Sequence, residues 1–368
     1  MPDLRFSEEQ DELRSIVRSM LDKRSDSAAV RTAIDSEAGY DESLWQALCE
    51  QVGVAALPVP EEHDGAGAGF GETSVVLEEI GHALAPSPLL ASTVAAQALL
   101  GGSSDAAARL LPRVAAGEVA TLAWAGATGG PDVEEPVVAS PASGTGRDHE
   151  LNGTVDHVLD GTAASVLLVA ARTPDGPALF EVDPSQVTRE AQPAMDLTLR
   201  LARITLDGTP ATRIGGPDAL ARAHTVGSAA VAAVAVGVAQ RGLDMTVDYV
   251  KQREQFGRPI GSFQAVKHRL ADLHVLVETS RSAALAAAVA VDDAVAGGAW
   301  DQARRSASVA QAWCSDAVAR VAAETVQLHG GIAITWEHDA HLVLKQAQTL
   351  GILLGPARAH RSAVLASL

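Results

Sequence analysis

Three long helical patterns fill the last part of the chain and limit what it can fold into. They span residues 217–252, 262–296 and 300–328, and each is rich in alanine. Helices of this length bury their apolar faces by packing along one another, which favours a helical bundle. Between the first two lies the stretch REQFGRPIGSFQAVKHRLADL, residues 253–273, which holds two glycines and a proline. Because glycine and proline interrupt helices, we expect a turn of defined shape there.

The first third of the chain is also helical in pattern. Ser7 and Gln10 have the spacing of a capping box, so the first helix is expected to begin after Ser7. Clusters of glycine and proline separate the further helical segments. These segments are expected at about residues 42–52, 73–84, 88–101 and 104–116.

The middle of the chain has a different rhythm, with short β-type runs such as VLLVAAR and ALFEV between turn-forming dipeptides. The dipeptides are Asn152-Gly153, Asp160-Gly161, Asp175-Gly176 and Asp207-Gly208. The sequence therefore predicts a multi-domain α+β fold. Its parts are an N-terminal helical domain (residues 1–118), a middle antiparallel β domain (119–214) and a C-terminal helical bundle (215–368).

Composition restricts the function. The formal net charge of −18 over 368 residues repels nucleic-acid phosphates and anionic lipid. Cys49 and Cys314 lack metal-ligand spacing and are expected to be buried free thiols of a reducing compartment. The N-terminal sequence lacks signal-peptide chemistry, and the apolar run Thr225–Gln240 is shorter than the about 18 to 20 residues of a membrane span. We therefore expect a cytoplasmic protein with no nucleic-acid or membrane partner.

Common catalytic motifs do not occur in the sequence. There is no Walker A, GxSxG or HExxH pattern, and the glycines of DGAGAGFGE do not have GxGxxG spacing. His329 and His338 are too isolated to predict a catalytic triad or a metal site. No metal site is therefore predicted.

Two motifs carry a specific resemblance. The stretch at 253–273 has the form RxQFGxPIxxFQ, and the later segment ETVQLHGGIAITWEH, residues 324–338, contains QxxGG. With both motifs the chain resembles the acyl-CoA dehydrogenase family, and the resemblance covers essentially the whole chain. The family has an N-terminal helical domain, a middle β domain and a C-terminal four-helix bundle. The resemblance therefore implies that the C-terminal bundle has four helices.

The resemblance also implies FAD as the cofactor. In the family this corner binds the FAD of a neighbouring subunit: an arginine can pair with the pyrophosphate, and an aromatic ring packs near the adenine. The cofactor-binding residues that the resemblance implies are Arg253, Gln255, Phe256, Gln264, Gln327, Gly330 and Gly331. The alternative is a solvated turn between helices, with Phe256 anchored in the core.

The family's reaction is the α,β-dehydrogenation of an acyl-CoA thioester, in which a glutamate removes the α proton and a hydride moves to the flavin. The sequence departs from the family at this point. The positions at which relatives carry the base are Gly227, Val234 and Leu354 in this chain. No catalytic base is therefore predicted at the usual positions. Glu254 and Glu337 stay open as displaced acids.

A second departure lies in the β domain, where LAWAGATGGPDVEEP, residues 122–136, replaces the family's flavin-contacting loop; Trp124 and Thr128 are candidates to substitute. Three hypotheses follow. The chain is a base-lacking subunit that completes the FAD site of a homologous partner in a heterotetramer acting on a bulky acyl-CoA, such as a steroid side chain. Alternatively, it is a self-sufficient homo-oligomer with a displaced acid, or a flavin-free scaffold. An electron-transfer acceptor is the further partner expected of a dehydrogenase.

Overall fold

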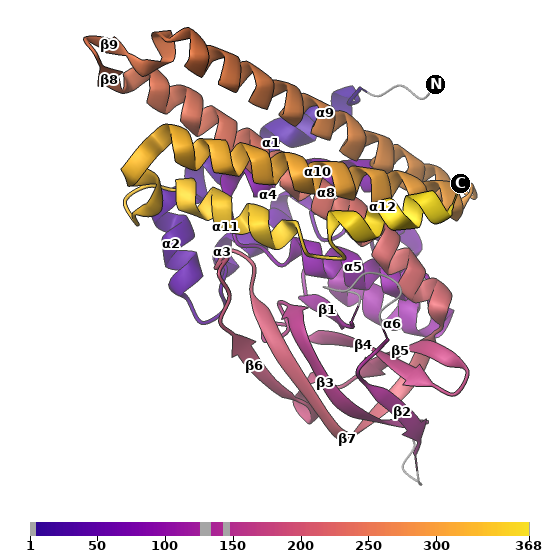
Figure 1. Ribbon diagram of the computed structural model, residues 1–368. Helices are drawn as coiled ribbons and strands as arrows, with labels where there is room; N and C mark the ends of the chain where they lie inside the picture. The colour runs from indigo at the N-terminus through magenta and orange to yellow at the C-terminus, as the bar shows by residue number, and fades with distance from the viewer. Residues whose placement is uncertain (1–4, 126–133, 143–147, 368) are drawn as a thin grey trace.

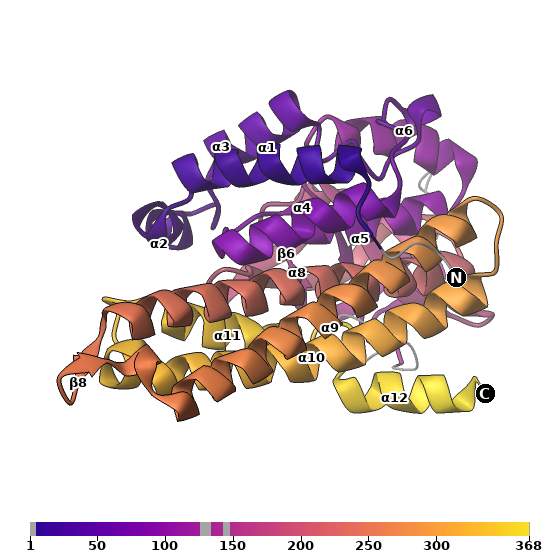
Figure 2. The ribbon, with the colours of Figure 1, turned by 90° about the horizontal axis from the view of Figure 1, so that it is seen from above.

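The computed structural model describes residues 5–125, 134–142 and 148–367. The N-terminal helices and the long C-terminal helices form two layers, seen edge-on in Figure 2. A β domain lies below both layers in the view of Figure 1. The predicted architecture of helical, β and helical parts is therefore confirmed.

The N-terminal layer contains six α-helices in the described residues. They are α1 (Glu8–Arg24), α2 (Ser27–Asp35), α3 (Glu42–Ala47), α4 (Phe70–Ala83), α5 (Leu89–Leu100) and α6 (Ser104–Ala115). The capping box forms as predicted, because the Ser7 hydroxyl accepts from the Gln10 N–H and the Gln10 side chain accepts from the Ser7 N–H, each at 3.1 Å. The helix α2 was not expected from the sequence; the Asp26 side chain caps it by accepting from the Ala29 N–H.

In the described residues, five strands of the middle domain form a closed ring of hydrogen-bonded neighbours. The strands of this domain are β1 (Ala120–Ala123), β2 (Val138–Pro141), β3 (His149–Leu159), β4 (Val166–Thr173), β5 (Gly176–Val182), β6 (Thr188–Gln192) and β7 (Leu201–Gly215). The ring runs β4-β2-β3-β7-β5 and back to β4, while β1 and β6 pair at its sides. The sheet is mixed and not fully antiparallel as predicted, since β1 and β2 run parallel to β4. The strand β3 runs antiparallel to β2, and the chain reverses again after β3. The strand β4 therefore runs in the same direction as β2.

The C-terminal part is a bundle with one more helix on its surface. Its helices are α8 (Pro217–Gln252), α9 (Gln264–Val295), α10 (Trp300–His329), α11 (Ala340–Leu350) and α12 (Ala357–Ala366). The helix α8 is central, because it packs against α4 and α5 on one side and α9, α10 and α11 on the other. The bundle and the N-terminal helices thus share one apolar core.

In contrast to the expectation from the run Thr225–Gln240, two of these helices are long and apolar enough to cross a membrane by length and composition. In α8, 89% of the apolar window is buried inside the protein, and in α9 the share is 44%. The apolar character of α8 is therefore that of a core helix.

The helices α4 and α8 cross with their backbones in contact. A Cβ atom on Gly237 of α8 would lie 1.9 Å from the Glu78 carbonyl oxygen, and one on Gly81 of α4 would lie 2.4 Å from the Val234 carbonyl oxygen. Both distances are shorter than non-bonded atoms allow. The crossing therefore depends on a glycine in each helix.

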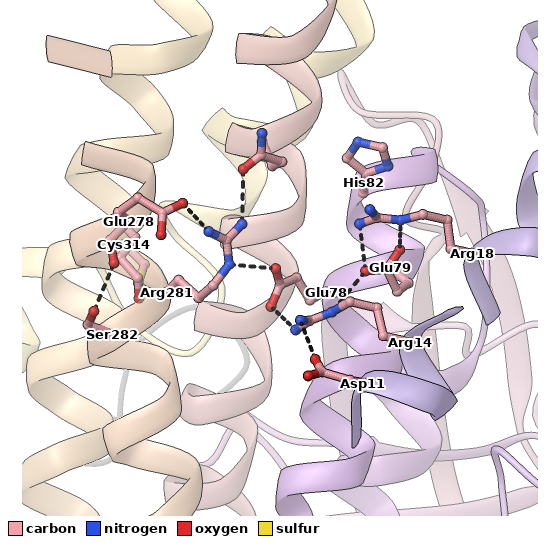
Figure 3. A network of polar contacts seen from close by, with 12 residues as sticks. Asp11, Arg14, Arg18, Glu78, Glu79, His82, Glu278, Arg281, Ser282 and Cys314 are labelled. Carbon is pink, nitrogen blue, oxygen red and sulfur yellow. Dashed lines mark hydrogen bonds and ion pairs between the residues drawn. The ribbon is translucent and has the colours of Figure 1, made fainter. Parts of the chain in front are cut away.

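A network of charges around two buried carboxylates lies beside this crossing (Figure 3). Glu78 of α4 accepts from Arg14 of α1 at 3.4 Å and from Arg281 of α9 at 3.0 Å. The neighbouring Glu79, only 1% exposed, accepts two bonds from Arg18 at 2.7 and 2.8 Å. Buried carboxylates are tolerated when they are paired in this way, so the network holds α1, α4 and α9 in one arrangement.

The two cysteines are free thiols, as expected. Cys314 is buried, but Cys49 is only partly buried, so the expectation of burial was wrong for Cys49. Burial raises the pKa of each thiol to about 12, so both stay protonated near neutral pH.

We expect Gly237→Ala to lower the free energy of unfolding by about 1 to 3 kcal/mol, because the added methyl group forces α4 away from α8. Gly351→Ala at the end of α11 is the control, since its added Cβ makes only ordinary contacts at 3.4 Å. The control should change the free energy by less than about 0.5 kcal/mol. Urea unfolding measures both, and equal midpoints for Gly237→Ala and the parent would contradict the close crossing.

Candidate functional site

The stretch that interrupts the helices is a short hairpin. Its strands are β8 (Glu254–Gln255) and β9 (Arg258–Pro259). The two residues at its tip, Phe256 and Gly257, have φ angles of 55° and 74°. Positive φ at both central residues is the requirement of a type I′ turn, which is normal for glycine and uncommon for phenylalanine. The tip thus holds the Phe256 backbone in a conformation that a phenylalanine rarely adopts.

The Phe256 ring is 92% exposed. The alternative in which Phe256 anchors the turn in the core is therefore wrong. Phe263 braces the hairpin instead, because its ring packs edge-on against Phe256 at 6.1 Å, and the Arg258 guanidinium lies 4.1 Å from its ring centre. The hairpin tip thus exposes the Phe256 ring, while Phe263 and Arg258 pack together beneath it.

Arg253 joins α8 to the hairpin. Its N–H donates to the Tyr249 carbonyl at 2.8 Å, and its own carbonyl accepts from the Ile260 N–H at 2.8 Å. Both backbone groups are thus fixed, while the side chain is exposed. Among the described residues, nothing forms a hydrogen bond or ion pair with the Arg253 guanidinium. Its donors are available to an anion from outside this chain.

The second motif lies at the same end of the bundle. The helix α10 ends at His329, whose ring stacks on Tyr249 of α8 at 4.5 Å. Because Tyr249 is one turn before Arg253, and His329 directly precedes Gly330, this stack brings the two motifs together. The positive φ of 67° at Gly330 then turns the chain away from α10.

The sequence predicts that His329 and His338 are isolated, but the structure places the two rings side by side. The His329 and His338 rings lie 4.5 Å apart, and His338 also packs edge-on against Tyr249 at 6.4 Å. Burial lowers the pKa of both imidazoles, so both favour the neutral form. In the described ranges no group of three or more His, Cys, Asp or Glu side chains could hold a metal ion. These rings therefore serve to pack the two motifs against each other.

The remaining residues of the predicted cofactor site lie around this junction. Gln327, Gly330 and Gly331 are exposed, and a Cβ on either glycine would meet no atom within 4 Å. The Gln255 side-chain amide donates to the Glu254 carbonyl, and Gln264 contacts His268. An unpaired guanidinium, an exposed aromatic ring, amide groups and open glycine backbone are the groups that a flavin dinucleotide requires. The exposed residues thus fit FAD, although the individual contacts stay a prediction.

The structure brings two of the three base positions into contact. A Cβ on Gly227 of α8 would lie 2.7 Å from a methyl carbon of Leu354, in the connection between α11 and α12. Leu354 is only 2% exposed and has a φ of 58°. Its side chain therefore fills the space that a side chain at position 227 would need.

Two imidazoles hold Leu354 in place. The Nε2 atoms of His224 and His360 each lie 3.0 Å from the Leu354 carbonyl oxygen, and their rings stack at 5.8 Å. Trp124 packs edge-on against His224 at 6.0 Å. Burial first, and then the neighbouring His360, lower the pKa of His224 to about 4, so this imidazole is neutral. Two imidazoles whose pKa values are lowered by burial thus contact Leu354 at the position where the family has a carboxylate.

The other candidate acids lie elsewhere. The carbonyl group of Val234 faces Gly81 of α4, so this position belongs to the α4–α8 crossing. Glu254 is exposed on the hairpin, which lies at the opposite end of the bundle from α12 (Figures 1 and 2). Glu337 is exposed before the start of α11. Neither acid adjoins the Gly227–Leu354 pair.

The β-domain loop contributes a buried acid that the sequence reasoning missed. Glu135 accepts a hydrogen bond from the Ala125 N–H at 2.7 Å, and burial raises its pKa to about 7. Of the two candidate substitutes, Trp124 packs against His224, and Thr128 lies outside the described residues. His224 and Tyr249 were not predicted as site residues. They lie one helical turn before Gly227 and Arg253, so their spacing from these two positions could have identified them in the sequence.

Comparison with known proteins agrees with this geometry. Residues 7–118 match the N-terminal domain of acyl-CoA dehydrogenases, and residues 215–368 match their C-terminal domain. Acyl-CoA dehydrogenase IpdE2 of Mycolicibacterium smegmatis is 40% identical over 353 residues, which cover 96% of each chain.

Two solved structures are similar over almost the whole chain. The Tcur3481-Tcur3483 steroid ACAD G363A variant is 34% identical with a TM-score of 0.87, covering 98% of this chain and 97% of that one. The ChsE4-ChsE5 complex of Mycobacterium tuberculosis is 31% identical with a TM-score of 0.87, covering 99% and 98%. With both domains matched and its two motifs joined at one end of the bundle, the chain belongs to the acyl-CoA dehydrogenase family, whose cofactor is FAD.

Proposed function

We propose that this chain is the base-lacking subunit of a heteromeric acyl-CoA dehydrogenase and completes an FAD site on a homologous partner subunit. The observation that carries the proposal is the contact between Gly227 and Leu354. A base must lie beside the α carbon to remove its proton. Both positions that adjoin this point are without a carboxylate, and Leu354 fills the space.

The β8–β9 hairpin supplies the other half of the proposal. FAD, when bound, accepts the hydride that leaves the β carbon of the acyl group. Arg253 would hold the pyrophosphate, with Phe256 beside the adenine and Gln327 as a further hydrogen-bonding group. All three side chains are exposed, so they are suited to a cofactor bound mainly by another subunit. This chain would then bind and orient, while its partner removes the α proton.

The relatives support a heteromeric enzyme with a bulky substrate. The name of one similar structure describes a steroid ACAD with two components, and that of another describes a ChsE4-ChsE5 complex. By analogy we assign this chain to a heterotetramer that acts on a steroid-type acyl-CoA and passes electrons to a transfer protein. The self-sufficient alternative needs Glu254 or Glu337, and both are remote from Leu354. The scaffold alternative gives no role to the unpaired Arg253.

We expect the full chain, purified alone and supplied with FAD, to show only trace dehydrogenation of acyl-CoA thioesters with an artificial electron acceptor. The reason is that neither of the two base positions in contact, Gly227 and Leu354, carries a carboxylate. The complex isolated from the native cell with its partner, identified by mass spectrometry, is the active control. Turnover by the chain alone that Glu254→Gln or Glu337→Gln abolishes would establish the displaced-acid alternative instead.

We expect Arg253→Ala to weaken FAD retention by the assembled complex about tenfold to a hundredfold, because one charge-assisted contact to the pyrophosphate is lost. Arg253→Lys should recover part of the affinity, since an ammonium keeps the charge without the planar fork. The flavin-to-protein ratio after gel filtration measures the effect. Lys251→Ala, an exposed change on the last turn of α8, should leave the ratio unchanged. A full flavin content in Arg253→Ala would remove the cofactor role of this corner.

A further inference from the structure

A cavity of about 420 Å³ lies at the end of the bundle away from the β8–β9 hairpin. The start of α8, the start of α10 and the end of α5 each contribute residues to its lining. The cavity is lined by Gly101, Asp218, Ala221, Arg222, Thr225, Trp300, Asp301 and Arg304. It shares no residue with the predicted cofactor site.

Arg222 is the distinctive group of this lining. Its Nε donates to the Gln97 side-chain oxygen at 2.9 Å, and its Nη1 makes a long contact of 3.5 Å to the Leu100 carbonyl. The guanidinium carbon lies 5.0 Å from the centre of the Trp300 ring. No carboxylate of the described part of the chain lies within ion-pair distance of Arg222. A guanidinium has five N–H donors, so most of those of Arg222 have no protein acceptor.

In the described part of the chain, the hydrogen-bond partners of the Arg222 guanidinium are therefore neutral groups. Burial lowers its pKa to about 10, and no neighbouring acid restores it. At neutral pH the side chain still carries its charge, because this pKa is well above 7. A partly buried cation without a counter-charge is stabilised by any anion that enters the cavity. Gln97, which is only 4% exposed, fixes the direction of the guanidinium through the bond to Nε.

The other charges of the lining do not neutralise Arg222. Arg304 pairs with Asp301 on the first turn of α10, so these two charges offset each other. Asp218 is exposed at the start of α8, where a carboxylate is stabilised by the N–H groups of the helix end. The helix α10 begins beside the cavity at Trp300 without a side-chain cap.

We propose that this cavity binds the phosphate group of a phosphorylated ligand, with the Arg222 guanidinium as anchor and the Trp300 indole as one wall. The planar fork of arginine matches two oxygens of a phosphate at once, and an indole face offers a flat apolar surface to the rest of the ligand. Two sources share this chemistry: a nucleotide phosphate and a free inorganic phosphate. The inference does not depend on the proposed function, because binding is measured without catalysis or flavin.

A second, smaller cavity shows where a longer ligand would extend. It has about 70 Å³ and shares Ala221, Thr225 and Arg304 with the first. Its far wall is formed by His224 and His360, whose imidazoles bond to the Leu354 carbonyl. A ligand anchored at Arg222 thus has space in the direction of Leu354, but little beyond the two rings.

Calorimetric titration of the full chain with inorganic pyrophosphate, ADP and coenzyme A tests the proposal. We expect at least one of the three to bind, and Arg222→Met to weaken that binding about tenfold to a hundredfold. Arg222→Lys should recover part of the affinity, because it keeps the charge and loses the fork. Tighter binding of ADP or coenzyme A than of pyrophosphate identifies a nucleotide as the source, and equal or tighter binding of pyrophosphate identifies a free phosphate.

Arg305→Met is the matched control, because Arg305 follows Arg304 on α10 and does not line the cavity. It should bind the probes as the parent does. The melting temperature of each variant shows whether it is folded, and Arg222→Lys provides the comparison if Arg222→Met is unstable. Binding of none of the three probes would overturn the proposal, and so would equal affinities for the parent and a folded Arg222→Met.

Discussion

The contact between the backbones of α4 and α8 fixes the position of everything else in the helical part of the molecule. Two glycines allow the helices to approach until Gly237 lies against the Glu78 carbonyl. That closeness places the Glu78 carboxylate between α1 and α9, where Arg14 and Arg281 neutralise it. A wider crossing would move Glu78 relative to these arginines, so the ion pairs depend on the close approach. The position of α8 follows from both.

The helix α8 then relates two regions of different chemistry. Its first turns carry Arg222, His224 and Gly227, around the cavity and the filled base position. Its last turns carry Tyr249 and lead directly to Arg253. Because α8 is buried and packed on both sides, the core fixes the position of its last turn, from which the exposed hairpin begins. The net charge of −18 does not prevent Arg253 from binding an anion, because salt screens the repulsion between that anion and distant carboxylates.

Much of the fold could be predicted from the sequence, because periodicity reports which face of a helix is buried. The long helices, the capping box at Ser7 and the change of rhythm in the middle all depend on nearby residues. Contacts between distant residues could not be predicted in this way. Tyr249 and His329 are separated by most of two helices, and nothing local predicts that their rings stack. The short helix α2 was missed because its nine residues give little periodicity to detect.

The same difference between local and distant information applies to the candidate site. The absence of a carboxylate at Gly227 and Leu354 was readable from the sequence, but their contact was not. That contact means that the two family positions for the base are alternatives at one point in space. A side chain at 227 requires the Leu354 side chain to move or to be smaller. Substitutions at these two positions are therefore coupled, and an acid at 227 is accommodated best when Leu354 is replaced in the same molecule.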